Sequence, residues 1–180
     1  MPVVSVAPNS SAHPLPRASL ARRLGGLFYE ALLLTALILA AGFALLPWVS
    51  PGLASPGPQL TIPTPAMRVA LLCALLTGAG CYYVWSWTGA RRTLPMTTWH
   101  LRVVTVAGEN LSRSAATTRY LAAWIGPALA LFAYEGLRPL GFGAYALCLV
   151  SLNYVWAIGD RDRQFLHDRI AGTVLQRTAD

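Results

Sequence analysis

Residues 24–46, LGGLFYEALLLTALILAAGFALL, decide the fold class, because these 23 residues contain a single charge, Glu30. A helix needs about 20 apolar residues to cross the hydrocarbon core of a bilayer. A signal peptide has a shorter apolar core, roughly 7 to 15 residues long. Arg22 and Arg23 precede the stretch and Pro47 follows it. We therefore predict a transmembrane helix over 24–46.

The composition of the whole chain agrees with a membrane protein. Of 180 residues, 55% are hydrophobic and 12% are charged, about half the usual charged fraction of a soluble domain. At this length no separate soluble catalytic domain fits beside the apolar stretches, so a multidomain enzyme is excluded. All fourteen basic residues are arginine, and with seven acids they give a net charge of +7. Because the chain is so hydrophobic, we assign this charge to contact with anionic lipid and expect no nucleic-acid partner.

Three further apolar stretches predict three more spans, over 69–88, 120–137 and 140–159. The last two come from one apolar run, which the turn residues 135–139 divide. Gly126 and Pro127 predict a kink in the third span, since proline cannot donate a helical hydrogen bond. The predicted fold is an all-α membrane protein with four transmembrane helices.

The polar segments complete this prediction. Residues 1–19 and 176–180 are interpreted as tails, the first one disordered, and residues 20–175 as the transmembrane domain. Within the basic loop 89–119, apolar and polar residues alternate over 99–105, the period of a strand. A turn at 107–110 predicts that this loop holds a small β-hairpin.

The arginines also predict the orientation. Twelve of the fourteen lie before the first span, in the loop 89–119 or after the last span, and only Arg68 and Arg138 lie in the other two loops. Cytoplasmic loops carry the excess of arginine, so both termini are predicted to be cytoplasmic. This arrangement requires an even number of spans.

Glu30 is the first candidate functional residue, because a carboxylate inside a membrane span needs a partner. Arg23 lies seven residues earlier, on the same helix face, about 10 Å away along the axis. We expect an arginine, Arg23 before others, to reach Glu30. Two roles remain open: a proton or cation relay, and a buried pair that only fixes helix packing.

The segment 164–173 is the second candidate site, since it follows the last span closely. Asp168 could accept hydrogen bonds from Arg22 and Arg23, with His167 as a group that titrates near neutral pH and Arg169 as a further charge. The alternative, which the spacing favours, is an interfacial helix whose charges are solvated.

No cofactor or metal site is predicted. Cys73, Cys81 and Cys148 lack the close spacing of zinc or redox motifs, and the three histidines are scattered. The sequence also contains no nucleophile with a matched base and no nucleotide-binding motif, so we do not expect an enzyme.

Three blocks of sequence resemble the RDD family of bacterial membrane proteins, in the family's order: RRLGGLFYE at 22–30, TLPMTTWHLRVV at 93–104 and QFLHDRIAGT at 164–173. The family is named for an arginine at the start of its first helix, an aspartate within that helix and a second aspartate in the C-terminal block. By resemblance these positions are Arg22 or Arg23, Glu30 and Asp168. Glutamate at position 30 keeps the charge on an arm one methylene longer.

The resemblance implies a multi-pass protein of the bacterial inner membrane. Transport is proposed for the family, including cation/proton antiport for some members, so monovalent cations or protons are the implied ligands. The second hypothesis is a non-transporting membrane factor that binds or stabilises another membrane complex. A homo-oligomer and a membrane-protein partner are both open.

The topology can be tested with reporter fusions. Fusions at Pro56 and Gly136 are expected to be external, and fusions at Gly108 and after Asp180 cytoplasmic, because of the arginine distribution. Reporter activity in intact cells measures each position. A periplasmic C-terminus would show that the chain has an odd number of spans.

Overall fold

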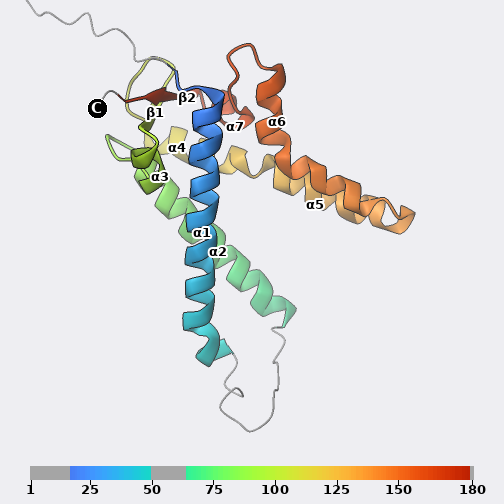
Figure 1. Ribbon diagram of the computed structural model, residues 1–180. Helices are drawn as coiled ribbons and strands as arrows, with labels where there is room; N and C mark the ends of the chain where they lie inside the picture. The colour runs from blue at the N-terminus through green and yellow to red at the C-terminus, as the bar shows by residue number, and fades with distance from the viewer. Residues whose placement is uncertain (1–16, 50–63, 179–180) are drawn as a thin grey trace, which may run out of the picture.

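The computed structural model describes residues 17–49 and 64–178, and it is mostly helical (Figure 1). The α-helices are α1 (Leu20–Val49), α2 (Pro65–Trp87), α3 (Leu94–Thr98), α4 (Arg113–Ala123), α5 (Ile125–Leu137), α6 (Leu152–Gly159) and α7 (Leu166–Ile170). Two 3-10 helices, η2 (Arg138–Leu140) and η3 (Gly143–Ser151), connect α5 to α6, and the strands are β1 (Leu101–Thr105) and β2 (Thr173–Arg177).

Three helical segments of the described chain are long and apolar enough to cross a membrane: Leu20–Ala44, Pro65–Trp87 and Arg113–Leu140. The third contains the predicted span 120–137, and the first two cover the predicted spans 24–46 and 69–88 except for their last one or two residues. The fourth predicted span, 140–159, forms a shorter apolar helix over Gly143–Gly159, whose first part is 3-10. The predicted multi-pass helical fold is thus confirmed with three candidate spans and one shorter apolar helix.

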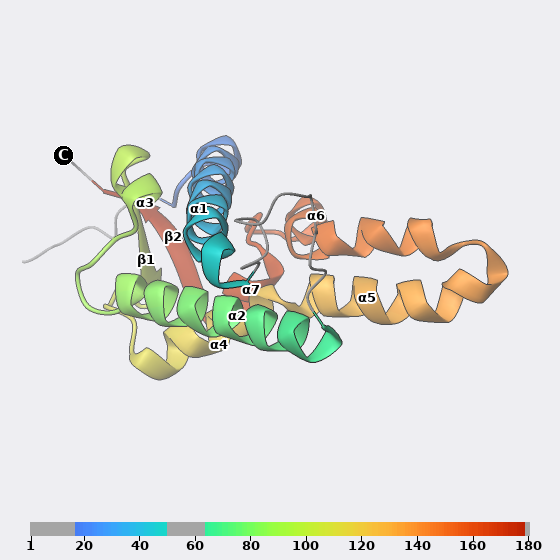
Figure 2. The same ribbon diagram turned by 90° about the horizontal axis from the view of Figure 1, so that it is seen from below.

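The apolar helices leave most of their surface uncovered within this single chain. In the most hydrophobic window of α1 no residue is buried, and Figure 2 shows α5 and η3 side by side, extending away from α1 and α2. Exposed apolar surface of this extent needs lipid or another membrane protein to cover it. Apart from the pairing of α5 with η3, the elements pack against one another mainly near the end of the molecule that carries the two strands.

The strand predicted in the loop 89–119 is confirmed, but the predicted hairpin is wrong. β1 pairs antiparallel with β2 from the C-terminal segment, from Leu101 opposite Arg177 to Thr105 opposite Thr173. The residues of the predicted turn instead lead back toward α4, and the Thr105 N–H donates to the Glu109 carbonyl. β2 pairs with the backbone groups of β1 that a hairpin strand would otherwise occupy, and Val103 and Val104 of β1 are buried in the protein.

Together, residues 88–112 and 160–178 form a compact unit, here called the cap. Its core includes Met96, Leu101, Leu111 and Leu175. Ala18, which was predicted to lie in a disordered tail, is only 4% exposed, and its N–H donates to the Leu175 carbonyl. Residues 1–16 of that predicted tail lie outside the described residues. The other predicted tail is also shorter than expected, because β2 runs to residue 177.

The cap sits directly on the first turns of α1 because glycine occupies the contact. A Cβ on Gly25 would lie 2.5 Å from the Trp99 ring, and a Cβ on Gly26 would lie 3.0 Å from Leu101 Cδ1. Two adjacent glycines therefore allow α3 and β1 to approach the backbone of α1. Farther along α1 and α2, a Cβ on Gly42 or Gly78 would meet no atom of the described residues within 4 Å, whereas a Cβ on Gly80 of α2 would lie 3.0 Å from the Tyr120 ring.

The kink predicted at Gly126 and Pro127 is confirmed. α4 ends at Ala123 and α5 begins at Ile125, because Pro127 has no N–H to donate to the Ala123 carbonyl four residues earlier. The Asn153 side chain supplies that hydrogen bond from α6, with Nδ2 2.7 Å from the carbonyl oxygen. Asn153 is 1% exposed. Gly126 allows α5 to approach η3 closely, since a Cβ at this position would lie 2.8 Å from the Leu149 carbonyl oxygen.

We expect Asn153→Leu to lower the stability of the protein by about 1–3 kcal/mol, because it leaves the Ala123 carbonyl without a partner. Thermal unfolding in detergent would measure this loss. Pro127→Ala restores a backbone donor at the same carbonyl, so the double variant Asn153→Leu/Pro127→Ala should recover part of the stability. Equal losses in the single and double variants would contradict this explanation of the kink.

Candidate functional site

A cavity of about 240 Å³ lies where the helices meet the cap. Its walls come from α1, α2, α4 and α6 and from the cap elements α3, β1, α7 and β2. The charged or titratable residues Arg23, Glu30, Arg119 and His167 line it. This cavity is the candidate functional site, because it brings together side chains from both ends of the sequence.

Asp168 makes the central polar contact beside the cavity. Its Oδ1 accepts a hydrogen bond from Arg119 Nε at 2.7 Å and another from Thr173 Oγ1 at 3.2 Å. Asp168 is 0% and Arg119 4% exposed, so the pair is buried. The guanidinium of Arg119 also lies over the Trp87 ring, 4.2 Å from its centroid.

This burial corrects the expectation that the charges of 164–173 are solvated. The predicted partners of Asp168 are also wrong: Arg119 of α4 pairs with it, and Arg22 and Arg23 do not. Burial alone would disfavour the ionised carboxylate, but the charge and hydrogen bond of Arg119 outweigh it, so the pKa of Asp168 lies below its ordinary value. Asp168 is therefore ionised, with Oδ1 held by Arg119 and Thr173, while its Oδ2 is buried without a hydrogen-bond partner in the described part of the chain.

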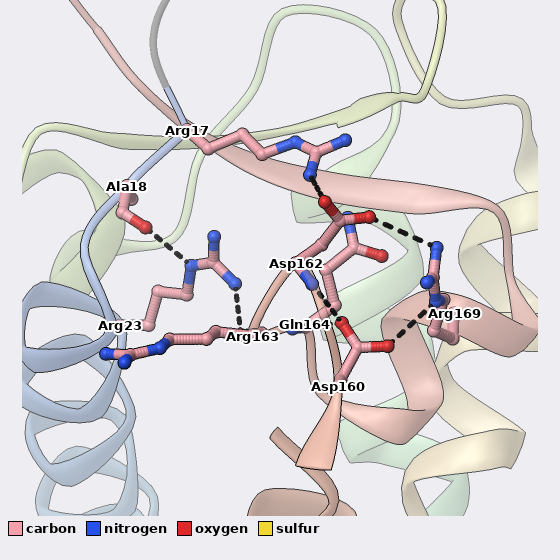
Figure 3. A network of polar contacts seen from close by, with 8 residues as sticks. All are labelled: Arg17, Ala18, Arg23, Asp160, Asp162, Arg163, Gln164 and Arg169. Carbon is pink, nitrogen blue, oxygen red and sulfur yellow. Dashed lines mark hydrogen bonds and ion pairs between the residues drawn. The ribbon is translucent and has the colours of Figure 1, made fainter. Parts of the chain in front are cut away.

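The two arginines at the start of α1 hold the cap instead (Figure 3). Arg23 donates from Nε to the Ala18 carbonyl at 2.9 Å and from Nη1 to the Arg163 carbonyl at 2.9 Å. Arg22 donates from Nη1 to the Trp99 carbonyl at 3.2 Å. These bonds connect the first turn of α1 to two segments of the cap.

Figure 3 also shows an ion-pair network that closes the loop between α6 and α7. Asp162 accepts from Arg17 at 2.6 Å, and Arg169 lies 3.0 Å from Asp160 and 3.4 Å from Asp162. Asp160 Oδ2 also accepts the backbone N–H groups of Asp162 and Gln164, and hydrogen bonds of this kind lower the pKa of Asp160. Arg169, an expected accessory of the site, thus belongs to this network.

Glu30 lies on the cavity wall and has a different partner from the one expected. Its Oε2 accepts a hydrogen bond from Thr93 Oγ1, the N-cap residue of α3, at 3.1 Å. The ion pairs found within the described residues do not include Glu30. The prediction that an arginine at the start of the first helix pairs with it is wrong, because the carbonyl groups of the cap hold Arg23.

His167 also lines the cavity and is 7% exposed. Its Nε2 lies 3.7 Å from Asp168 Oδ1, and its Nδ1 is buried without a hydrogen-bond partner in the described part of the chain. Burial lowers the pKa of His167 to about 4, helped by the charge of Arg119 and opposed by that of Asp168. His167 is therefore a neutral imidazole at neutral pH.

Two residues of this arrangement were missed by the sequence analysis. Arg119 counted only as one of the arginines that set the orientation, although it directly precedes the apolar run that begins at Tyr120. Thr93 belongs to the middle block, and the pattern Thr-Leu-Pro is a helix N-cap signal. Neither signal indicates which acid each residue contacts, because those acids are 49 and 63 residues away.

The sequence model of the RDD family matches residues 17–172. The chain belongs to the RDD family. Comparisons with curated proteins and with solved structures gave no match. The RDD match begins at the residue where the described chain begins and covers the arginines of α1, Glu30 and Asp168, so this family sequence builds both the cavity and most of the cap.

The buried neutral His167 predicts a specific pH dependence. Because the unfolded histidine binds a proton near pH 6.5 and the folded one only near pH 4, stability is present above pH 6.5 and falls between pH 6.5 and pH 4. The loss is on the order of 3 kcal/mol. The lowered pKa of Asp168 stabilises the fold above its ordinary value of 3.8, and this contribution is lost only at lower pH, outside the range in which His167 titrates.

His167→Gln should remove this slope, measured as unfolding in detergent at a series of pH values. The control is Phe165→Leu, since Phe165 packs against the His167 ring at 5.6 Å between centroids but does not titrate. The control should keep the slope even if its stability is lower. An unchanged slope in His167→Gln would refute the assignment.

Proposed function

We propose that this RDD-family protein is a cation/proton-coupled transporter of the bacterial inner membrane, with four spans and both termini cytoplasmic. In this arrangement the cap lies at the cytoplasmic surface, because it carries seven of the fourteen arginines. Glu30 then lies about ten residues into α1, roughly 15 Å along the helix axis. The cavity extends from Glu30 to the residues of the cap that face the helices.

The observation that carries the proposal is the contrast between Glu30 and the other charges. Asp168 is occupied by Arg119, and Arg23 by two carbonyl groups. Glu30 accepts a hydrogen bond from the neutral Thr93 hydroxyl, interacts with the Tyr83 hydroxyl as well, and faces a cavity. A carboxylate in this position exchanges ligands without breaking a structural ion pair, as a coupled transporter requires.

The proposed exchange is balanced in charge. One proton leaves the Glu30 carboxyl as one monovalent cation binds to the carboxylate, and the reverse exchange follows on the other side of the membrane. Arg119, Asp168 and Arg23 keep their partners throughout, so they position the walls of the cavity. The net charge of the site is the same before and after each exchange.

A second candidate function is a membrane factor that stabilises another complex. The observation that favours it is the exposed apolar surface of the described helices, including Phe28 at 68%, Phe132 at 82% and Ile158 at 80%. Lipid, a second copy and a partner protein would all cover such a surface. This function needs no exchange at Glu30, so the following experiment separates the two.

Glu30→Gln is expected to abolish cation-driven proton movement while abundance and thermal stability stay near wild type. A glutamine side chain still accepts the Thr93 hydrogen bond, and no ion pair of the described residues loses a partner. Purified protein in liposomes with an internal pH dye measures the flux after a gradient of a monovalent cation is applied.

The matched variant is Asp168→Asn, which also neutralises a buried acid. It leaves Arg119 buried without its counter-charge, a loss of about 3–5 kcal/mol, so membrane abundance should fall. Normal flux in Glu30→Gln would contradict the transport proposal, and a large loss of abundance in Glu30→Gln would instead favour a structural role.

A further inference from the structure

Aromatic side chains make up a large part of the cavity wall. They come from α2, the α4–α5 junction, α6 and the start of α7, and they are Tyr83, Trp87, Tyr120, Trp124, Tyr154 and Phe165. Four of them form a continuous row, because Tyr83 contacts both Trp87, at 4.9 Å between centroids, and Tyr120, at 6.1 Å, and Tyr120 contacts Trp124 at 6.1 Å. The cavity is thus an aromatic enclosure with few polar groups.

One cation already lies against this wall. The Arg119 guanidinium is 4.2 Å from the centroid of the Trp87 ring. The faces of such rings are negative, and a cation within about 6 Å of a ring centroid is attracted to them. The aromatic row therefore provides the electrostatic surface that binds a desolvated positive charge.

The charges at the cavity leave Glu30 as the group available to a ligand. Arg119 is neutralised by Asp168 at 2.7 Å. Arg23 directs two of its nitrogens toward the carbonyl groups of Ala18 and Arg163 (Figure 3). Glu30 is the one carboxylate among the described residues that line the cavity, and no ion pair of those residues includes it.

The lining suits an organic cation better than a bare metal ion. A hard cation replaces its hydration shell with several oxygen ligands. Besides Glu30, the described lining offers chiefly tyrosine hydroxyls, and that of Tyr120 already donates to the Leu76 carbonyl at 2.6 Å. Within the described chain, no group of three or more potential metal ligands is present. The alkyl surface of an ammonium cation, in contrast, is compatible with apolar walls.

We propose that the cavity binds a small alkylammonium cation, with its positive charge against Glu30 and its alkyl groups against the aromatic row. A volume of about 240 Å³ is below the roughly 300–1,000 Å³ of sites for drug-sized ligands, so the ligand is small. The inference rests on the proposed function and names the cation that exchanges with the proton. The ammonium group belongs to a free solute or to a lipid headgroup.

Binding is tested on the purified full-length protein in detergent, without any transport assay. Tetramethylammonium chloride should raise the unfolding temperature in a saturable manner, whereas sodium chloride at the same ionic strength should not. Glu30→Gln should abolish the saturable shift. Equal effects of the two salts on the wild-type protein, or an undiminished shift in Glu30→Gln, would overturn the inference.

Ring substitutions test the aromatic row. Trp124→Leu should weaken tetramethylammonium binding about tenfold, and Trp124→Phe, which keeps an aromatic face, should weaken it by less than about threefold. The control is Trp85→Leu, because Trp85 is 62% exposed, stacks under Arg91 and is not among the residues lining the cavity. Equal affinities for Trp124→Leu and Trp124→Phe would contradict a cation–π site.

Flux measurements in vesicles distinguish a lipid headgroup from a free cation as the natural ligand. They also test the transport function and the alkylammonium site separately. In pure phosphatidylglycerol vesicles, which contain no lipid ammonium, a tetramethylammonium gradient should drive proton movement. If added phosphatidylethanolamine competes with tetramethylammonium, the natural ligand is a lipid headgroup. If it does not compete, the natural ligand is a free cation. Flux driven by sodium alone would overturn the alkylammonium inference but keep the transporter, and binding without any flux would overturn the transporter but keep the site.

Discussion

The buried pair of Arg119 and Asp168 is the interaction on which the rest of the structure depends. Arg119 comes from the helix that begins the third candidate span, and Asp168 from α7 of the cap, and their side chains are 2.7 Å apart with almost no exposure. Because both charges are removed from water, neither tolerates the loss of the other. The pair therefore fixes where the cap sits on the helices. It also positions Trp87, over which Arg119 stacks, and Thr173, which bonds to Asp168 and begins β2.

The protein separates its charges into two groups with different environments. Arg17 and Arg169 form a partly exposed network with the acids of the loop 160–163, which helps to hold the cap together, and salt and water screen its ion pairs. Deeper in the molecule, the ion pair of Arg119 neutralises Asp168, and burial keeps His167 neutral. Glu30 is the remaining acid at the cavity, and its polar partners there are the neutral hydroxyls of Thr93 and Tyr83. This distribution gives one carboxylate freedom to bind a ligand while its neighbours maintain the walls.

How far the sequence predicts this molecule can be seen at particular residues. The span over 24–46, the kink at Pro127 and the strand over 99–105 all follow from local periodicity and backbone chemistry, and the structure contains each of them. The partner of that strand could not be predicted, because a nearby turn and a distant strand satisfy the same backbone groups. Asp168 appeared as a solvated charge since spacing along a helix does not reveal that a second helix covers it. Glu30 and Thr93 were both within the quoted family blocks, but nothing in either block shows that they are in contact.

The sequence by itself determined that this is a multi-pass membrane protein of the RDD family with its arginines gathered in three segments, because hydrophobic length, charge counts and sequence blocks are properties of the chain. Only the tertiary structure decided which arginine meets which acid. Arg22 and Arg23 were the nearer candidates for Asp168 by topology, yet carbonyl groups of the cap hold them and Arg119 takes the acid. The physical reason is that a buried charge is stabilised only by a partner at hydrogen-bonding distance. That distance is set by how segments far apart in the chain pack, which local sequence patterns do not encode.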